Sequence, residues 1–461
     1  MSLNPFLKSR IDDAKALVAE LRKEYDYASV FGASTKSTRI ISSTYSSSMQ
    51  SGESGTGFVI KLYNGKYYSE YSCDDIRGLT CEEIKSAVSL NGLQQESVKT
   101  APINEEELTK SFTRLDNHPI DGEEVLSRLN SIREKVEKYD ERVVNVRVYQ
   151  MKREESSIFV SEKKCLDQFY TWTNFRMAVT VRDGDNIKSG TDSSNSADTL
   201  EALEGIEKKW QLIADNAIML LKAKPIVPGT YDIITHPYVS GLIAHEAFGH
   251  GVEMDMFVKH RAKAVNYVDK YVASELVNMR DGAAGILSAA SYFFDDDGVL
   301  AHNTEIIRDG ILVTGISDVL SALQLGTKPT GNGRRQSFDH KSYTRMTNTY
   351  FCAGEDKVED MIASIKHGYL LYDCSNGMED PKNWQIQCTA GYGLEIKDGK
   401  FTGEIVSPVV ISGSVLDLLG SVSMVSEEFE MDGIGMCGKG YKEWVYVADG
   451  GPYLKARAKL G

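Results

Sequence analysis

Two histidines and a glutamate lie close together near the middle of the chain. His245 and Glu246 are followed by His250 in the segment His-Glu-Ala-Phe-Gly-His. Neutral imidazole groups are common ligands of Zn²⁺ in proteins, and a glutamate beside a ligand can take a proton from water. The residue types therefore indicate a hydrolytic metal site.

The spacing of the two histidines is unusual for such a site. They are five positions apart, whereas the common HExxH motif places its histidines four apart on one helix face. At about 100° per residue, five steps separate two side chains by roughly 140° on a regular α-helix. Gly249 and Gly251 flank the second histidine and permit a wider, π-like turn. We therefore expect a distorted helix that brings the two rings together.

A third ligand is needed, because a catalytic zinc site commonly has three protein ligands and one open position. Glu253 falls in the same sector of the helix as His245 and is the nearby candidate. Cys437 is the distant candidate, since the glycines around it give a thin backbone that can approach another element. Its alternative interpretation is a buried cysteine in a glycine-rich turn. The residue types alone leave the choice open.

Three separated stretches of the chain resemble the TldD/PmbA family of metallopeptidases. These stretches are HEAFGHGVEMD (245–255), RMTNTYFCAG (345–354) and DGIGMCGKG (432–440). Their order and spacing match the TldD side of the family, and a looser likeness extends over the whole chain. The resemblance implies that His245, His250 and Cys437 bind one Zn²⁺ per chain, with Glu246 as general base. Glu253 then becomes a candidate for orienting a histidine or the metal-bound water.

The same resemblance implies a substrate and a partner. Family members cleave unfolded or extended peptides and form dimers, and some partner subunits lack the metal motif. This chain retains every ligand and so resembles the active type. We expect a peptide substrate, and either a homodimer or a heterodimer with a metal-free family member.

The first half of the chain predicts helices alternating with strands. Apolar residues at helical spacing predict helices over 9–25, 80–91, 121–138 and 199–223. Alternating or apolar runs predict strands over 38–48, 56–62, 143–149, 157–160 and 175–181. Two helix–strands–helix units, offset by roughly 110 residues, suggest a duplicated α+β domain with halves 1–100 and 101–222. Residues 97–107 are the expected linker between these halves.

The second half of the chain has a different residue pattern. Short apolar runs alternate with Asp-Gly pairs that are typical of tight turns between strands, as at 297–298, 309–310 and 398–399. Helices are predicted over 240–254, 317–325 and 356–367. We therefore expect an α+β protein in which residues 1–222 form an amino-terminal α+β domain. Residues 223–461 then form a carboxy-terminal, mainly antiparallel β domain that carries the metal-binding helix. The likeness to the family implies the same arrangement.

Several polar residues outside the motif are candidates for substrate contacts. Residues 326–345 read as a long basic loop, and loops above about 12–15 residues are often functional. Arg345 can meet a substrate carboxylate or carbonyl, and Thr347 and Asn348 can bind an extended chain or cap a turn. His236, just before the motif helix, can stabilise an oxyanion or be an ordinary loop residue.

Composition excludes several classes of protein. A net charge of −14 and a pI near 5.2 argue against nucleic-acid binding. No apolar run approaches the roughly 18 residues that span a bilayer, and no apolar signal segment begins the chain. The seven cysteines are irregularly spaced without a CxxC pair, and six of them read as small buried hydrophobic residues. We expect a cytoplasmic protein without membrane contact.

The sequence thus predicts a zinc-dependent peptidase in which Glu246 activates a water molecule. Two other classes stay open at this stage. One is a non-catalytic assembly subunit with a structural metal, which a closed four-ligand site including Glu253 would support. The other is a metal-dependent oxidoreductase, because two histidines and a cysteine also suit copper.

Overall fold

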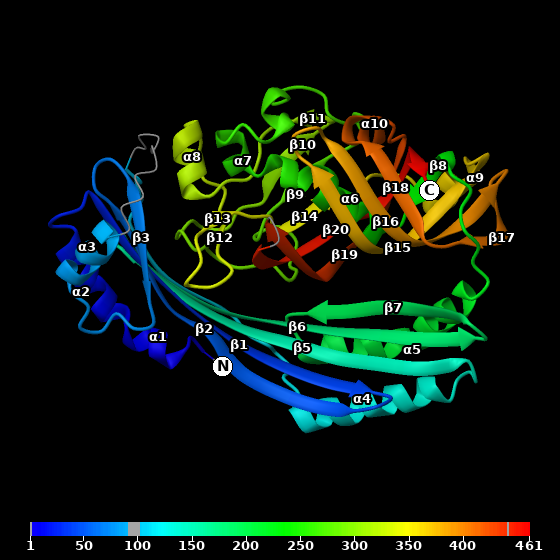
Figure 1. Ribbon diagram of the computed structural model, residues 1–461, viewed down its shortest axis with the longest axis horizontal. Coiled ribbons are helices and arrows are strands. Elements are labelled where there is room, and N and C mark those ends of the chain that lie inside the picture. Colours follow the sequence, from blue (N-terminus) through cyan, green and yellow to red (C-terminus); the bar gives the residue numbers. More distant parts are fainter. Residues whose placement is uncertain (1, 91–101, 440–441) are drawn as a thin grey trace.

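The computed structural model describes residues 2–90, 102–439 and 442–461. Two β-sheets form its frame, one built from the first half of the chain and one from the second (Figure 1). Helices lie on the outer face of the first sheet and within the second half. Among the described residues, no helix has both the length and the apolar character needed to cross a membrane.

The first sheet has seven strands among the described residues, in the order β3-β2-β1-β5-β6-β4, with β7 paired to β6. Its strands are β1 (Tyr27–Ser43), β2 (Ser47–Tyr63), β3 (Tyr68–Cys73), β4 (Leu108–Arg114), β5 (Val143–Ser161), β6 (Lys164–Asp183) and β7 (Asn186–Ser196). Neighbouring strands are antiparallel except for β4 and β6. Both predicted halves of the amino-terminal domain therefore supply strands to one sheet.

Five helices of the first half flank this sheet in the part that the structure describes. They are α1 (Pro5–Ser9), α2 (Ile11–Leu21), α3 (Cys81–Leu90), α4 (Gly122–Glu137) and α5 (Thr199–Leu220). Figure 1 shows α4 and α5 side by side below the long strands. On α4, Val125, Leu129, Ile132 and Val136 are buried at helical spacing, and they pack with strand residues such as Val148.

Several predicted boundaries in the first half were wrong. The helix expected over 9–25 is the shorter α2, and α1, which was not predicted, precedes it; the two are joined at Arg10, which pairs with Asp75. The strands are much longer than their apolar runs, because residues 47–55 of β2 are mostly exposed yet pair in register with β1. Residues 97–101 of the expected linker lie outside the described residues, and strand β4, which follows directly after the linker, was not predicted.

The second sheet has eleven strands in the described chain, in the order β11-β10-β9-β14-β20-β18-β16-β15-β8. Its strands are β8 (Gly229–Thr235), β9 (Met279–Asp281), β10 (Thr304–Arg308), β11 (Ile311–Leu312), β14 (Asn348–Phe351), β15 (His367–Asp380), β16 (Gln385–Lys397), β17 (Lys400–Val406), β18 (Val409–Ser414), β19 (Met424–Lys439) and β20 (Lys442–Leu460). Strand β17 pairs with β16, and β20 pairs with β19 and β8 as well. The pairing is largely antiparallel, which confirms the predicted α+β class.

The helices of the second half are short. They are α6 (Pro237–Ile243), η1 (Ala244–Gly249), η2 (His250–Val252), α7 (Met254–Val258), η3 (Lys263–Asn266), α8 (Val319–Leu325), α9 (Val358–Ala363) and α10 (Val415–Gly420). The helix predicted over 240–254 is therefore a chain of four segments that starts at residue 237. The helix predicted over 356–367 covers only six residues, because the chain enters β15 at His367. The predicted domain boundary after residue 222 falls between α5 and β8.

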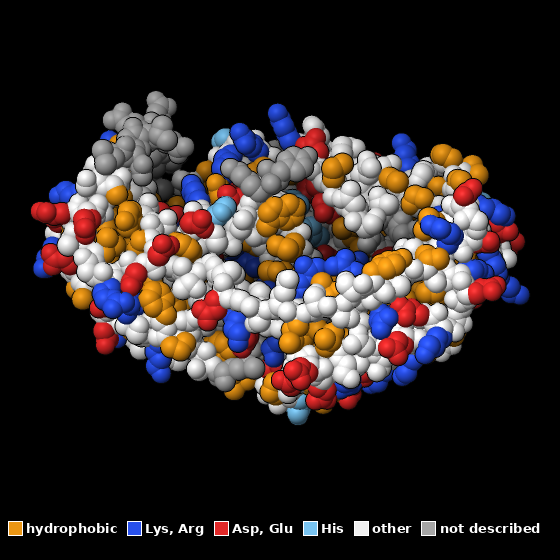
Figure 2. Space-filling model, turned by 60° about the horizontal axis from the view of Figure 1, so that its bottom comes forward, with side chains coloured by type: hydrophobic (Ala, Val, Ile, Leu, Met, Phe, Trp, Pro, Cys, Tyr) orange, Lys and Arg blue, Asp and Glu red, His pale blue; other side chains and the backbone are white. Residues whose placement is uncertain are grey.

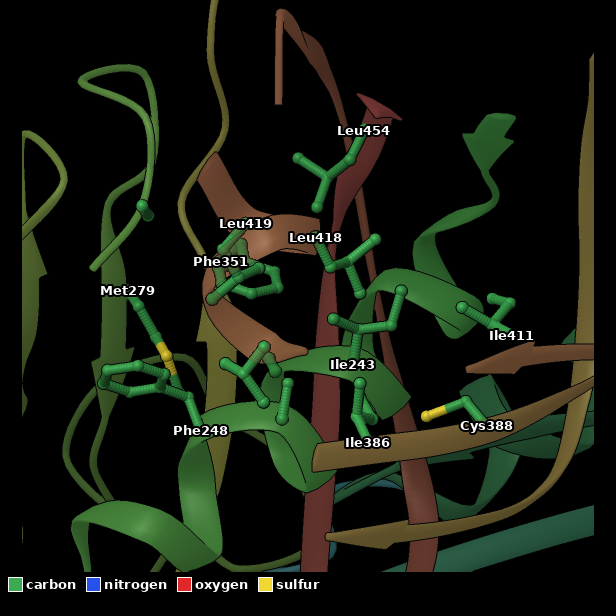
Figure 3. Close-up of a cluster of buried hydrophobic side chains, with 14 of the residues drawn as sticks. Ile243, Phe248, Met279, Phe351, Ile386, Cys388, Ile411, Leu418, Leu419 and Leu454 are labelled. Carbon is green, nitrogen blue, oxygen red and sulfur yellow. The ribbon is translucent and has the colours of Figure 1, made fainter. Parts of the chain in front are cut away.

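The largest hydrophobic cluster surrounds the segment from α6 to η1. Figure 3 shows Ile243 and Phe248 of this segment among side chains of the second half, including Ile386 and Leu454. The helix that carries the histidines is thus held on its apolar side by a packed core. The cysteine prediction was partly wrong: all seven thiols are free, but of the six expected to be buried hydrophobic residues only Cys388 is buried, and the other five are half-buried.

Candidate metal centre

The segment with the two histidines starts as an α-helix and then widens. Residues Ala244–Gly249 form a π-helical turn, in which the His250 amide donates to the His245 carbonyl, five residues earlier. A Cβ atom on Gly249 would overlap Met346 Sδ and lie 3.3 Å from the Ala244 carbonyl oxygen. The predicted distortion is confirmed, and the glycine is needed because the widened turn packs directly against Met346.

The widened turn brings the two imidazole rings together. Their centroids are 5.1 Å apart and their planes are nearly perpendicular, at 88°. Cys437, on β19, completes the group, with its Sγ 3.3 Å from Nε2 of His250. One ligand atom from each of the three residues lies within 4.8 Å of the other two. A residue almost two hundred positions downstream therefore meets the helix motif.

The charges within this group favour the thiolate form of Cys437 and the protonated form of the two histidines, whose ring protons a bound metal would displace. Burial disfavours the thiolate of Cys437, but the two positively charged histidines outweigh burial and lower its pKa well below the usual value. Burial likewise opposes the charge on His245, yet Cys437 raises the pKa of His245 to about 9. Thiolate is the form of cysteine that binds metals. Two imidazoles and a thiolate form a donor set that suits zinc, so the residues fit the expected ion.

Glu246 lies beside this group and remains partly exposed. It lines a cavity of about 620 Å³ together with His245, His250 and Cys437. Strand β15 passes over it at Gly377, where an added Cβ would overlap Glu246 Cγ and lie 2.9 Å from Cδ. The glycine in β15 therefore leaves the room that the glutamate side chain occupies.

Glu253 lies behind His250, and it is not one of the three clustered residues. Its Oε2 is 3.6 Å from His250 Nδ1 and 3.0 Å from Lys439 Nζ, and its Oε1 is 3.5 Å from Arg345 Nε. Burial opposes its ionisation, but Lys439 and His250 outweigh burial and keep the pKa of Glu253 below its usual value. The geometry allows Glu253 to orient His250.

The other predicted substrate residues are placed away from the cavity. Arg345 is fully buried and donates to the backbone carbonyl of Cys437 at 2.8 Å, so it supports the cysteine strand. Thr347 is buried and donates to Asp281 at 2.7 Å. The buried amide of Asn348 donates to Ser291 Oγ at 2.8 Å. The structure leaves these three side chains no exposed surface for a substrate contact.

His236 is also separate from the metal group. Its ring accepts a hydrogen bond from the Tyr238 amide at the start of α6, and it lies among aromatic rings that include Tyr372. Burial, with a smaller effect of Lys209, lowers its pKa to about 4. The expected loop 326–345 is partly ordered by a short pairing of Gly333–Arg334 with Tyr343–Thr344.

Two acidic residues near the centre were not predicted. Glu379, on β15, lines the cavity of His250, and both its carboxylate oxygens are buried without a well-formed hydrogen bond to a described residue. Asp449, on β20, lines a second cavity of about 360 Å³ with His245 and Glu246. Burial raises the pKa of Asp449 to about 7, although the charge of His245 opposes this. Each lies on a strand far from the helix motif along the chain, so the sequence carries no local signal for it.

The second cavity lies between the two halves of the chain, since Arg176 and Asp192 of the first sheet line it together with Asp373 and Asp449 of the second. Figure 2 shows the surface hollowed between the halves, with basic side chains gathered in the hollow. Both cavities contain His245 and Glu246, so the metal group can be approached from two sides.

Residues 228–458 match the family described as PmbA/TldA metallopeptidase C-terminal domain. The chain belongs to the TldD/PmbA family. The matched part of this family member includes the histidine helix, the hairpin with Cys437 and the strand with Asp449. The predicted resemblance is therefore confirmed.

Relatives with curated names agree with this assignment. A metalloprotease of Synechocystis sp. is 32% identical over 64% of this chain and 64% of its own length. A metalloprotease of Methanothermobacter thermautotrophicus is 32% identical over 68% of this chain and 69% of its own length. A protein of Saccharolobus solfataricus named zinc metalloprotease TldD homolog is 31% identical over 51% of this chain and 52% of its own length. The chain thus spans between half and about two thirds of these relatives.

A solved structure shows the family fold along nearly the whole chain. TldE from Thermococcus kodakarensis superposes with a TM-score of 0.75 and 18% identity, covering 97% of this chain and 99% of its own. At this identity the likeness concerns the fold alone.

Proposed function

We propose that this TldD/PmbA family member is a zinc-dependent peptidase. The observation that carries the proposal is the meeting of His245, His250 and Cys437 within 4.8 Å, beside Glu246 in a cavity. Three protein ligands leave one coordination position for water or substrate, which is the arrangement of catalytic zinc sites. The relatives named metalloproteases support the same conclusion.

In this proposal His245, His250 and Cys437 hold one zinc ion per chain. The bound ion supplies Lewis acidity toward a peptide carbonyl and toward water. Glu246 faces the cavity next to the ligands, takes a proton from the attacking water and passes it to the leaving amine. Glu253 keeps His250 in one orientation through Nδ1. Arg345 holds the backbone of Cys437, so that the thiolate stays aligned with the helix.

We propose an extended or unfolded peptide as substrate, because the ligands lie between two cavities that share His245 and Glu246. The protein is proposed to act in the cytoplasm as a homodimer or as a heterodimer with a metal-free family member. The neighbouring TldE fold supports a partner of the same architecture.

The two other functional classes, an assembly subunit with a structural metal and a copper oxidoreductase, receive less support. Glu253 faces Lys439 and Arg345 behind His250, which weighs against a closed four-ligand structural site. Metal analysis of protein purified without added metal separates the remaining cases. Close to one zinc per chain favours the peptidase, and an intense blue colour favours copper.

Glu246→Gln tests the mechanism. The variant should cleave a panel of unstructured peptides about 10²–10⁴-fold more slowly, because it removes the base. Its zinc content should stay at the wild-type value, since Glu246 is not one of the three clustered ligands. Glu359→Gln, at an exposed glutamate of α9, is the matched control and should cleave normally. Full peptidase activity of the Glu246→Gln variant would contradict the proposed mechanism.

A further inference from the structure

The two histidines of the metal group differ in what lies behind their rings. His250 has Nε2 toward Cys437 and Nδ1 toward the Glu253 carboxylate, at 3.3 and 3.6 Å. The ring of His245 also interacts with Cys437, but its Nδ1 is buried without a hydrogen-bond partner among the described residues. A histidine that binds a metal almost always donates its other ring N–H to an acceptor. As a metal ligand, His245 would therefore still need an acceptor for its Nδ1–H group.

Asp449 is placed to be this acceptor. Its Oδ1 would lie 2.6 Å from a Cβ atom on Gly241, so the carboxylate rests on the helix one turn before His245. Side chains on a helix lean toward its amino terminus, which tilts the ring of His245 in the direction of Gly241. Asp449 and His245 also line the same cavity. The helix can approach β20 this closely because Gly241 lacks a side chain.

His245 is also an electrostatic neighbour of Asp449. Burial raises the pKa of Asp449, as do Asp432, Glu246 and Cys437, whereas the charge of His245 lowers it. Asp449 lies on β20, directly opposite Asp432 on β19, and the same hairpin pairs Cys437 with Val445. One hairpin thus carries both the thiolate ligand and a carboxylate that shares a cavity with a histidine ligand.

We propose that Asp449 is a positioning residue that accepts a hydrogen bond from Nδ1 of His245, directly or through one water, when the metal is bound. Asp449 thus orients His245 through Nδ1, in the same way as Glu253 orients His250. The hydrogen bond makes Nε2 the metal-binding nitrogen of His245 and fixes the ring relative to Cys437. The inference rests on the proposed metal centre and does not depend on which peptide is cleaved.

The test is the zinc affinity of Asp449→Asn, Asp449→Ala and Asp449→Glu, measured by competition with a coloured chelator. Loss of such a carboxylate commonly weakens metal binding by about 10–100-fold, which is the expected rise in the zinc dissociation constant of the first two variants. Asp449→Glu should recover part of the affinity. Asp373→Asn is the matched control, because Asp373 lines the same cavity, and its zinc affinity should equal that of the wild type.

A second readout separates positioning from general damage to the fold. Cobalt in place of zinc gives absorption bands from the thiolate and from the ligand field, which depend on the ligand geometry. These bands should shift in Asp449→Asn and stay unchanged in Asp373→Asn, while the metal-free variants melt at the wild-type temperature.

Two results would overturn the inference. One is an Asp449→Asn variant with a zinc affinity within about twofold of the wild type and an unchanged cobalt spectrum, well below the change expected for a lost carboxylate. The other is a wild-type protein that takes up no zinc, which overturns the proposed centre as well. Weakened zinc binding in Asp449→Asn, in a protein that cleaves no peptide, contradicts the peptidase proposal and supports the role of Asp449.

Discussion

Gly377→Ala should disable Glu246 without disturbing the metal ligands. Strand β15 crosses the glutamate so closely that an alanine Cβ would overlap Cγ and lie 2.9 Å from Cδ and 3.1 Å from Oε1. Carbon atoms in contact are about 3.5–4.0 Å apart, so the glutamate must withdraw by about 1 Å. A displacement of this size at a reacting group can cost about 10² in rate. We therefore expect kcat to fall about 100-fold.

The assay is cleavage of an unstructured peptide, with zinc content measured on the same samples. Zinc should remain at the wild-type level, because no atom of His245, His250 or Cys437 is among the three nearest to the added methyl group. Gly420→Ala is the matched control, since a Cβ at that position meets no atom within 4 Å. This control should cleave the peptide at the wild-type rate.

A double-mutant cycle shows whether the effect passes through Glu246. Once Glu246→Gln has removed the base, the added methyl group has no base left to displace. Gly377→Ala should then cause little further loss. A single variant Gly377→Ala with kcat within about threefold of the wild type would refute the reasoning, because a methyl group in this place cannot leave the carboxylate where it is. Equal additional losses in both backgrounds would point to a general distortion of β15 instead.

Three further predictions concern the metal group and the packing of the two halves. Cys437→Ala should lose stoichiometric zinc, as measured by metal analysis, and retention of one zinc per chain would contradict the ligand assignment. Glu253→Gln removes a negative charge that balances the positive charge of Lys439 in a buried site. The free energy of unfolding in denaturant should therefore fall by about 3 kcal/mol. An unchanged unfolding midpoint would show that this network is not needed for stability. Burial opposes ionisation of Glu70, but Arg335 outweighs burial and lowers its pKa from 4.5 to about 2. The resulting stabilisation, about 3 kcal/mol, is complete above pH 4.5 and is lost as the pH falls toward 2. Acid unfolding of Glu70→Gln should lack this dependence, and identical pH profiles for variant and wild type would contradict it.

Local sequence patterns were sufficient to predict a helix wherever the spacing of residues within the segment itself determines the structure. The helices α4 and α5 follow from apolar residues at helical spacing, and both start at the expected place because Asp121 and Asp198 cap them. The same holds for the motif helix, where the five-residue spacing and the glycines predict the π-turn. In each case the information lies within a few helical turns.

The lengths of the strands could be determined only from the tertiary structure. Much of β2 has no apolar alternation, and it is a strand only because β1 pairs with it along most of its length. Strand β4 likewise depends on its parallel partner β6. Hydrogen bonds to a neighbouring strand can hold a polar segment in an extended form, and the partner cannot be read from the segment itself.

For the functional site, the sequence by itself determined the chemistry of the helix motif, namely two imidazoles, an adjacent carboxylate and glycines that permit a wide turn. Residue types alone left Glu253 and Cys437 as equal candidates for the third ligand. Only the tertiary structure decided which side chains surround the two rings. The pairing of β19 with β20 delivers Cys437 to the helix, while Lys439 and Arg345 draw Glu253 behind His250. The same packing buries Arg345, Thr347 and Asn348 and brings Asp449 to Gly241. The reason is physical: ligand bonds and buried charges act over a few ångströms in space, and residues that meet there lie far apart along the chain.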